Sequence, residues 1–168
     1  MRYLAAVLMS LGTFTTNALA DQAKGIELYN QGKYAEAVSA LRPVATEQPS
    51  NEQALTYLGL ALVKAGQSGE ALDPLKRSIA INEKNAEAHF GLGLAYGYQK
   101  KLDDSIRELE RAVELDPNHA YARYNLGLAY NQKKRVDLAV LHLTRFVELA
   151  PDAPETPQVK ALLRQLRR

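Results

Sequence analysis

Four glycines recur at a fixed interval, and this recurrence constrains the fold more than any other feature of the sequence. The constant spacing of 34 residues, which we call the repeat period, separates Gly25, Gly59, Gly93 and Gly127. The same period relates four leucines (Leu41, Leu75, Leu109 and Leu143) and four small residues (Ala37, Ala71, Ser105 and Ala139). A fixed period of about 20 to 50 residues is typical of proteins built from stacked repeats. We therefore divide the chain into four repeats, 18–51, 52–85, 86–119 and 120–153, followed by a C-terminal segment, 154–168.

Each repeat has the pattern of two helices. In the third repeat, Leu92 and Tyr96 form one apolar stripe at helical spacing, and the stripe ends at Lys100. A second stripe runs through Leu109 and ends before Pro117. Because Gly93 has no side chain, we expect the paired helices to approach closely there, with Leu109 filling the space beside them.

Two prolines fall within the predicted second helices. Pro43 and Pro74 each lack a backbone N–H and crowd the preceding turn of a helix. We therefore expect a kink or an outward bend at both places. An irregularity of the outer helices that packing tolerates accounts for them better than a functional hinge.

Several segments resemble the tetratricopeptide repeat (TPR) family. They are residues 31–37 (QGKYAEA) in the first repeat, and residues 86–93 (AEAHFGLG) and 115–118 (LDPN) in the third. The resemblance implies an all-α fold, a right-handed α-solenoid of four 34-residue helix-turn-helix repeats. The sequence departs from the family where a large aromatic residue is common, since Asp21, Leu55, His89 and Arg123 stand there.

The C-terminal segment, 154–168, is predicted to form a capping helix. Thr156 is the expected N-cap and Pro157 lies in the first turn. One side is apolar (Val159, Leu162, Leu163 and Leu166) and the other is basic (Lys160, Arg164, Arg167 and Arg168). Such a helix covers the exposed stripe of the last repeat. The alternative, a basic amphipathic helix that rests on an anionic membrane, is less favoured because the segment is short.

The first twenty residues have the pattern of a secretory signal peptide. A single charge, Arg2, precedes an apolar run, and the small residues Ala18 and Ala20 end the segment. We expect cleavage between Ala20 and Asp21 and export to a bacterial periplasm. An uncleaved anchor is the alternative, but the apolar stretch 3–14 gives roughly 18 Å of helix, against a hydrocarbon core of about 30 Å.

Composition and histidine placement argue against an enzyme. The chain has 21 Lys and Arg, 19 Asp and Glu and no cysteine, so it shows no nucleic-acid footprint, disulfide or Cys-ligated zinc. The three histidines, His89, His119 and His142, fall on different elements and are not expected to meet as metal ligands or as a catalytic base. We predict no catalytic residue, no metal and no cofactor.

The resemblance implies a concave surface lined by the first helices of the repeats. The candidate groove residues at the implied places are Tyr29, Tyr57, Leu60, Phe90, Leu94, Tyr98, Tyr121, Tyr124, Asn125, Leu128 and Asn131. Six of the ten aromatic residues beyond residue 20 fall there, and binding surfaces favour such rings. An apolar or amphipathic segment of a partner protein is the expected ligand. The alternative is that some of these residues, Tyr57 and Leu94 first, fill the space between neighbouring helices.

The turns between paired helices are rich in cations. The residues of this basic edge are Lys100, Lys101, Lys133, Lys134 and Arg135. Such charges usually serve solubility, and the alternative is a weak electrostatic guide for an acidic partner. The sequence thus favours a non-enzymatic scaffold or assembly factor of the cell envelope. A membrane-peripheral structural protein that uses the basic edge and the C-terminal helix is the alternative, and the partner and the oligomeric state stay open.

Overall fold

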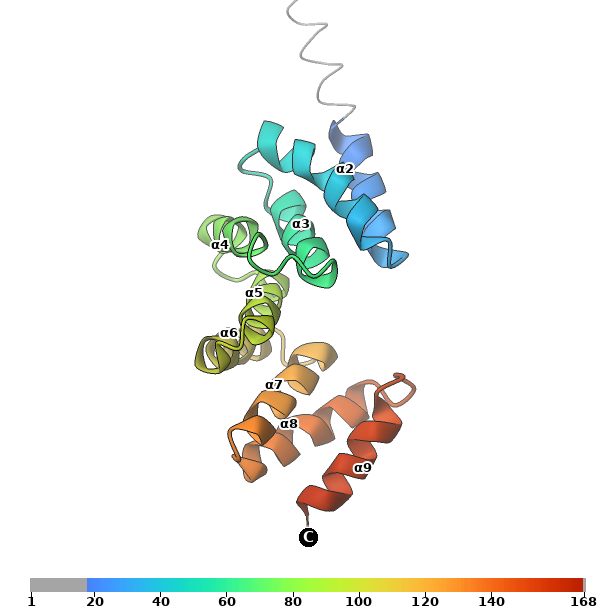
Figure 1. The fold of residues 1–168 in the computed structure, drawn as a ribbon, viewed down its shortest axis with the longest axis vertical. Coiled ribbons are helices and arrows are strands. Elements are labelled where there is room, and N and C mark those ends of the chain that lie inside the picture. The colour runs from blue at the N-terminus through green and yellow to red at the C-terminus, as the bar shows by residue number, and fades with distance from the viewer. Residues whose placement is uncertain (1–17, 168) are drawn as a thin grey trace, which may run out of the picture. The chain divides into compact units, whose positions relative to one another are not determined.

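A computed structural model describes residues 18–167. In this part of the chain the regular secondary structure is entirely helical, as predicted (Figure 1). A first helix includes residues 18–30. It is followed by α2 (Tyr34–Glu47), α3 (Glu52–Lys64), α4 (Leu72–Ile81), α5 (Ala86–Tyr98), α6 (Leu102–Leu115), α7 (Ala120–Gln132), α8 (Val136–Leu149) and α9 (Thr156–Leu166).

The helices form two compact units, divided between Ile81 and Asn82. In the first unit, α3 packs against both α2 and α4. In the second unit, each helix from α5 to α9 packs against the next one along the chain, and α5 also touches α7. The second unit therefore holds two complete hairpins, α5–α6 and α7–α8, and the helix α9 that follows them.

The repeated glycines lie where paired helices touch, as predicted. A β-carbon added at Gly59 would lie 2.4 Å from Leu75 Cγ, and one added at Gly93 would lie 2.7 Å from Leu109 Cγ. The corresponding distances are 2.5 Å for Gly25 and 2.7 Å for Gly127. Carbon atoms do not approach so closely, so a side chain at any of these four positions would have to displace the facing leucine.

In the second, third and fourth repeats, the first helix is capped by a side chain that accepts a hydrogen bond from the backbone N–H three residues later. Asn51 accepts a hydrogen bond from the Ala54 N–H at 3.0 Å, and Asn85 caps α5 in the same way. His119 takes this role for α7, where its Nδ1 accepts from the Ala122 N–H at 3.2 Å. The proton of a neutral His119 must then lie on Nε2, which is 3.3 Å from Glu87 Oε1.

The two prolines have different effects, and the expectation for Pro74 was wrong. Helix α2 continues through Pro43. By contrast, Pro74 lies in the first turn of α4, because this helix begins at Leu72 and not at residue 68, one repeat period after the start of α2. Because proline has no N–H to bond the carbonyl of Glu70, the helix starts later and Pro74 occupies a place where no donor is needed.

Two lysines adopt the left-handed backbone conformation that favours glycine. The turns of the first two repeats have Gly32 and Gly66 at φ 76° and 82°, and the next two have Lys100 and Lys134 at φ 60° and 58°. We expect Lys100→Gly and Lys134→Gly each to raise the free energy of unfolding by about 0.5 to 1 kcal/mol, because glycine removes the Cβ clash. Urea denaturation measures this gain, and Lys84→Gly, in a turn with ordinary φ, should give none. An unchanged or lower stability of both variants would refute the assignment.

The C-terminal helix α9 packs its apolar side against α8. Leu143 and Phe146 of α8 form a buried cluster with Val159 and Leu163 of α9. The expectation that Thr156 is the N-cap was wrong, because Glu155 precedes the helix and Thr156 is its first residue. The Thr156 hydroxyl instead donates to the Ala150 carbonyl at 2.6 Å, which ties the start of α9 to the end of α8.

The predicted signal peptide lies mostly outside the described residues. Residues 18–20 belong to the first helix, so the predicted cleavage between Ala20 and Asp21 falls within the described helix 18–30. Within residues 18–167, none of the helices has the length and apolar character needed to cross a bilayer.

Candidate functional site

Three helices of the second unit enclose an open pocket of about 580 Å³, which we call the α5–α7 pocket. Four of the predicted groove residues lie together in its wall, Leu94 and Tyr98 from α5 and Asn125 and Leu128 from α7. The other lining residues are Gly93, Gly97, Lys100, Leu102, Ser105, Leu109, Ala129 and Gln132. Lys100, a residue of the predicted basic edge, thus belongs to the same pocket.

The wall of the α5–α7 pocket combines apolar surface with amide groups. Tyr98 is 66% exposed, so its ring is free to contact a ligand. Asn125 Nδ2 donates to the Tyr121 carbonyl at 2.7 Å, which fixes the amide at the wall. At Gly97 an added β-carbon would lie 3.3 Å from Ser105 Oγ, so a side chain there would crowd the α6 wall of the pocket. Such a wall suits an apolar side chain whose neighbouring peptide groups need hydrogen-bond partners.

Two predicted groove residues are core residues instead. Leu60 is 2% exposed and Phe90 is 7% exposed, so neither offers a surface to a partner. The Phe90 ring lies against His119, with 4.5 Å between the ring centroids. In the first unit, Tyr29 and Tyr57 pack edge to face at 5.5 Å and are both half-buried. These contacts fill space between helices, which was the alternative interpretation.

The rings of Tyr121 and Tyr124 do not share a wall with Tyr98. Their centroids lie 6.0 Å and 5.0 Å from that of Phe146, on the side of α7 that faces α8. Burial, with the Glu155 carboxylate nearby, raises the pKa of both tyrosines. Asn131, the remaining predicted residue, is half-buried and does not line the pocket.

The basic edge is partly neutralised by local contacts. Lys133 Nζ lies 2.6 Å from Asp103 Oδ1, which joins the end of α7 to the start of α6. Lys101 Nζ lies 5.9 Å from the centre of the Tyr96 ring. Lys100, Lys134 and Arg135 are exposed, as the sequence predicts for an edge.

The three histidines lie apart and have structural partners. His89 is nearly buried, with Nδ1 2.9 Å from Glu108 Oε2 and Nε2 3.3 Å from the Glu83 carbonyl. His142 stacks on the Tyr130 ring at 5.8 Å. Burial and a hydrogen bond to Glu110 raise the pKa of Tyr130 to about 12. Among residues 18–167, no group of three His, Asp or Glu side chains is arranged to hold a metal ion.

Stability should fall in weak acid because of His142. Burial lowers the pKa of this imidazole, Arg123 lowers it further, and its Nδ1 is buried without a hydrogen-bond partner. The unfolded chain therefore binds a proton more readily than the folded one below about pH 6.5. We expect the free energy of unfolding to decrease as pH drops from about 7.5 to about 5. His142→Phe, which keeps the stacked ring but does not titrate, should show a smaller decrease, and an equal decrease would contradict this.

Sequence reasoning missed one polar residue of the α5–α7 pocket, Gln132. It lies one repeat period after Tyr98, so the period itself marks the position. Ser105 is one of the recurring small residues, and in the pocket wall its hydroxyl donates to the Gly93 carbonyl at 2.7 Å. Its place beside Gly97 follows from the helix pairing and not from any local motif.

The comparison with protein families agrees with these repeats. The tetratricopeptide repeat family matches residues 23–86 and 90–154. The chain belongs to this family. TPR domains bind protein or peptide partners, and no catalytic family is indicated. No curated protein matches the sequence.

Solved structures of TPR proteins confirm the α-solenoid fold class. MamA from Desulfovibrio magneticus is 30% identical, with a TM-score of 0.69, and the match covers 82% of this chain and 78% of that one. YrrB, described as a TPR protein with an unusual peptide-binding site, is 28% identical, with a TM-score of 0.68 over 95% of this chain and 82% of that one. A TPR protein of Thermus thermophilus shares the fold at 22% identity, with a TM-score of 0.72 over 89% and 80%.

Proposed function

We propose that this TPR protein is a non-enzymatic scaffold of the cell envelope that holds a segment of a partner protein in the α5–α7 pocket. The observation that carries the proposal is the meeting of Leu94, Tyr98, Asn125 and Leu128 in one open pocket. These residues are candidates because of their repeat positions, and their meeting depends on how α5, α6 and α7 pack.

The ligand that best fits this pocket is an apolar or amphipathic segment. The volume of the α5–α7 pocket, about 580 Å³, accommodates one or two large side chains. Tyr98 supplies a rigid ring, and the amides of Asn125 and Gln132 suit the peptide groups of the ligand. Lys100 at the rim favours an acidic residue next to the apolar one.

Export is part of the proposal and rests on residues 1–20. The charge on Arg2, the apolar run and the small residues Ala18 and Ala20 support a cleaved signal peptide. Intact-mass measurement on protein from the producing bacterium tests this. Loss of residues 1–20 is expected, and a full-length species as the sole product would contradict it.

Truncation of Tyr98 should weaken binding of the partner. The partner is first captured from an envelope extract and then titrated against the purified chain. Tyr98→Ala should cost on the order of 2 kcal/mol, about thirtyfold in Kd, because an exposed tyrosine ring in the wall of a pocket anchors its ligand. Circular dichroism should show unchanged helicity.

Tyr121→Ala is the matched control for this experiment. Tyr121 is also an exposed tyrosine of the second unit, at 41%, but it lies outside the α5–α7 pocket. Its truncation should change Kd less than threefold, which is about 0.6 kcal/mol. The groove hypothesis fails if Tyr98→Ala binds as wild type does, or if both variants lose binding equally.

A further inference from the structure

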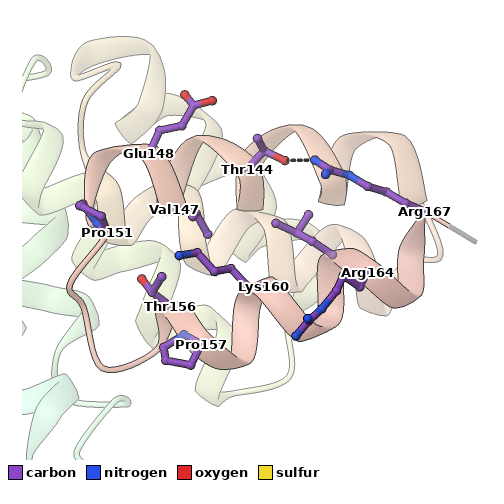
Figure 2. Close-up of a pocket in the computed structure, with 10 residues that line it drawn as sticks. Thr144, Val147, Glu148, Pro151, Thr156, Pro157, Lys160, Arg164 and Arg167 are labelled. Carbon is purple, nitrogen blue, oxygen red and sulfur yellow. Dashed lines mark hydrogen bonds between the residues drawn. The ribbon is translucent and has the colours of Figure 1, made fainter.

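A second hollow of about 680 Å³ lies between α8 and α9, and we call it the α8–α9 groove (Figure 2). Its apolar part includes Val147 of α8 and Leu163 of α9. Three cations of α9 line it as well, Lys160, Arg164 and Arg167. The sequence predicts these cations on the solvent side of a capping helix, and in the structure they border an open groove.

The repeat period relates the exposed side of α9 to the side of α7 that packs against α8. Ala161 lies one repeat period after Gly127, the position that touches the second helix of a hairpin. Lys160 lies at the position of Leu126, which is 0% exposed, and Arg164 at that of Tyr130, which is 7% exposed. In α7 this side is covered by α8, whereas in α9 it is exposed at residues 160, 161 and 164. The α8–α9 groove therefore lies where the second helix of a further hairpin would pack.

The cations of the groove lack acidic partners nearby. Among the described residues, neither Lys160 nor Arg164 forms an ion pair. The one acidic lining residue, Glu148, lies 3.0 Å from Arg145, and Figure 2 shows its side chain pointing away from α9. Arg167 is held by a 2.8 Å hydrogen bond to Thr144 Oγ1, drawn as a dashed line in Figure 2. Within residues 18–167, the charges of Lys160 and Arg164 are therefore not offset by an ion pair.

Beside the groove, α7 contributes a further cation, Arg123, and α8 contributes the Arg145–Glu148 ion pair. A smaller hollow shares Thr144 and Glu148 with the groove and adds Arg123 and Arg145. Burial lowers the pKa of Arg123, and the nearby Arg145 lowers it further, so these two cations repel each other. Leu141, in the same hollow, is 58% exposed. An occupant with both carboxylates and apolar side chains would complement this surface.

We propose that the α8–α9 groove binds an acidic amphipathic helix of a partner protein. The groove between two packed helices accepts the side-chain ridge of a third, so a helix is the shape that fits. Its apolar side packs on the half-buried Val147 and the exposed Pro157, and its carboxylates pair with Lys160 and Arg164. This site is separate from the α5–α7 pocket and does not depend on the function proposed for that pocket.

The probe is a fluorescent, hydrocarbon-stapled peptide with the sequence of residues 102–115, the chain's own most acidic second helix. It carries five carboxylates and two arginines, and the staple maintains a helix that is too short to be stable alone. A control peptide has every carboxylate replaced by an amide. Fluorescence anisotropy with the full chain should show saturable binding of the acidic peptide and at least tenfold weaker binding of the control.

Charge reversal identifies the site. The double variant Lys160→Glu/Arg164→Glu should weaken binding of the acidic peptide at least tenfold, with helicity unchanged. Lys76→Glu/Lys84→Glu, at two exposed positions outside the groove, makes a similar change of net charge and should weaken it less than threefold at about 0.15 M salt. Tyr98→Ala should leave peptide binding unchanged, which separates this site from the α5–α7 pocket.

Three results would overturn the proposal. The first is equal binding of the acidic and amide peptides, and the second is loss of binding in Tyr98→Ala, since that would place the peptide in the α5–α7 pocket. The third is sedimentation with phosphatidylglycerol vesicles that requires Lys160 and Arg164 while the peptide does not bind. That result would make the groove a contact for anionic lipid.

Discussion

Replacing Gly93 with leucine is expected to lower the free energy of unfolding by about 3 kcal/mol. A β-carbon at this position would lie 2.7 Å from Leu109 Cγ and 3.3 Å from the Leu109 backbone nitrogen. Rotation of the Leu109 side chain alone would not relieve the second contact, so α5 and α6 must separate. The loss should appear in urea denaturation although leucine is intrinsically the better helix former by about 1 kcal/mol.

Gly69→Leu is the control for the Gly93 variant. An added β-carbon at Gly69 would meet no heavy atom within 4 Å, and its backbone needs no left-handed conformation. The expected change is within about 0.5 kcal/mol of wild type. If Gly93→Leu is as stable as Gly69→Leu, the close approach of α5 and α6 is not a requirement of the fold.

Phe146→Ala is expected to cost about 3 to 5 kcal/mol and to release α9. Phe146 is 0% exposed, and its ring lies between Tyr124 of α7 and the α9 residues Val159 and Leu163. Removal of the ring leaves a cavity at the point where three helices meet. Hydrogen exchange should show faster exchange of the α9 amides, together with the lower stability in urea.

Phe146→Leu separates the loss of volume from the loss of the ring. Leucine fills most of the space, so the cost should stay below about 2 kcal/mol and the α9 amides should remain protected. Because the α8–α9 groove exists only while α9 is docked, Phe146→Ala should also weaken binding of the acidic peptide. Protected α9 amides in Phe146→Ala would show that the cluster around Phe146 does not hold this helix.

The hairpins could be predicted because simple steric rules fix them. A residue without a side chain, such as Gly93, must face a close neighbour, and the leucine that recurs with it, Leu109, lies on the opposing helix. The late start of α4 was missed because Pro74 was judged as an interruption of a fixed helix. Proline also moves helix ends, and here a later start satisfies the backbone better than a kink.

The candidate site could be predicted only in part. The repeat period places Phe90, Tyr98 and Tyr124 on first helices, but the direction of each ring depends on neighbours far along the chain. Phe90 packs on His119 and Tyr124 packs on Phe146, whereas Tyr98 is left open. Phe90 and Tyr124 share one repeat position, whereas Tyr98 shares another with the exposed Gln132, so the period separates Tyr98 from the other two but does not show which neighbours cover them.

Hairpins α5–α6 and α7–α8 place the helix cap and the glycine–leucine contact at the same repeat positions, so such a chain can change length by whole hairpins. Hairpin α5–α6 has its cap at Asn85 and its close contact between Gly93 and Leu109, and hairpin α7–α8 repeats both features at His119 and Gly127. A duplicated copy of residues 86–119 would therefore bring its own helix start and its own packing contact. Gain or loss of one whole hairpin by gene duplication or deletion preserves every local rule, whereas an insertion of a few residues within a helix breaks the pairing of glycine with leucine.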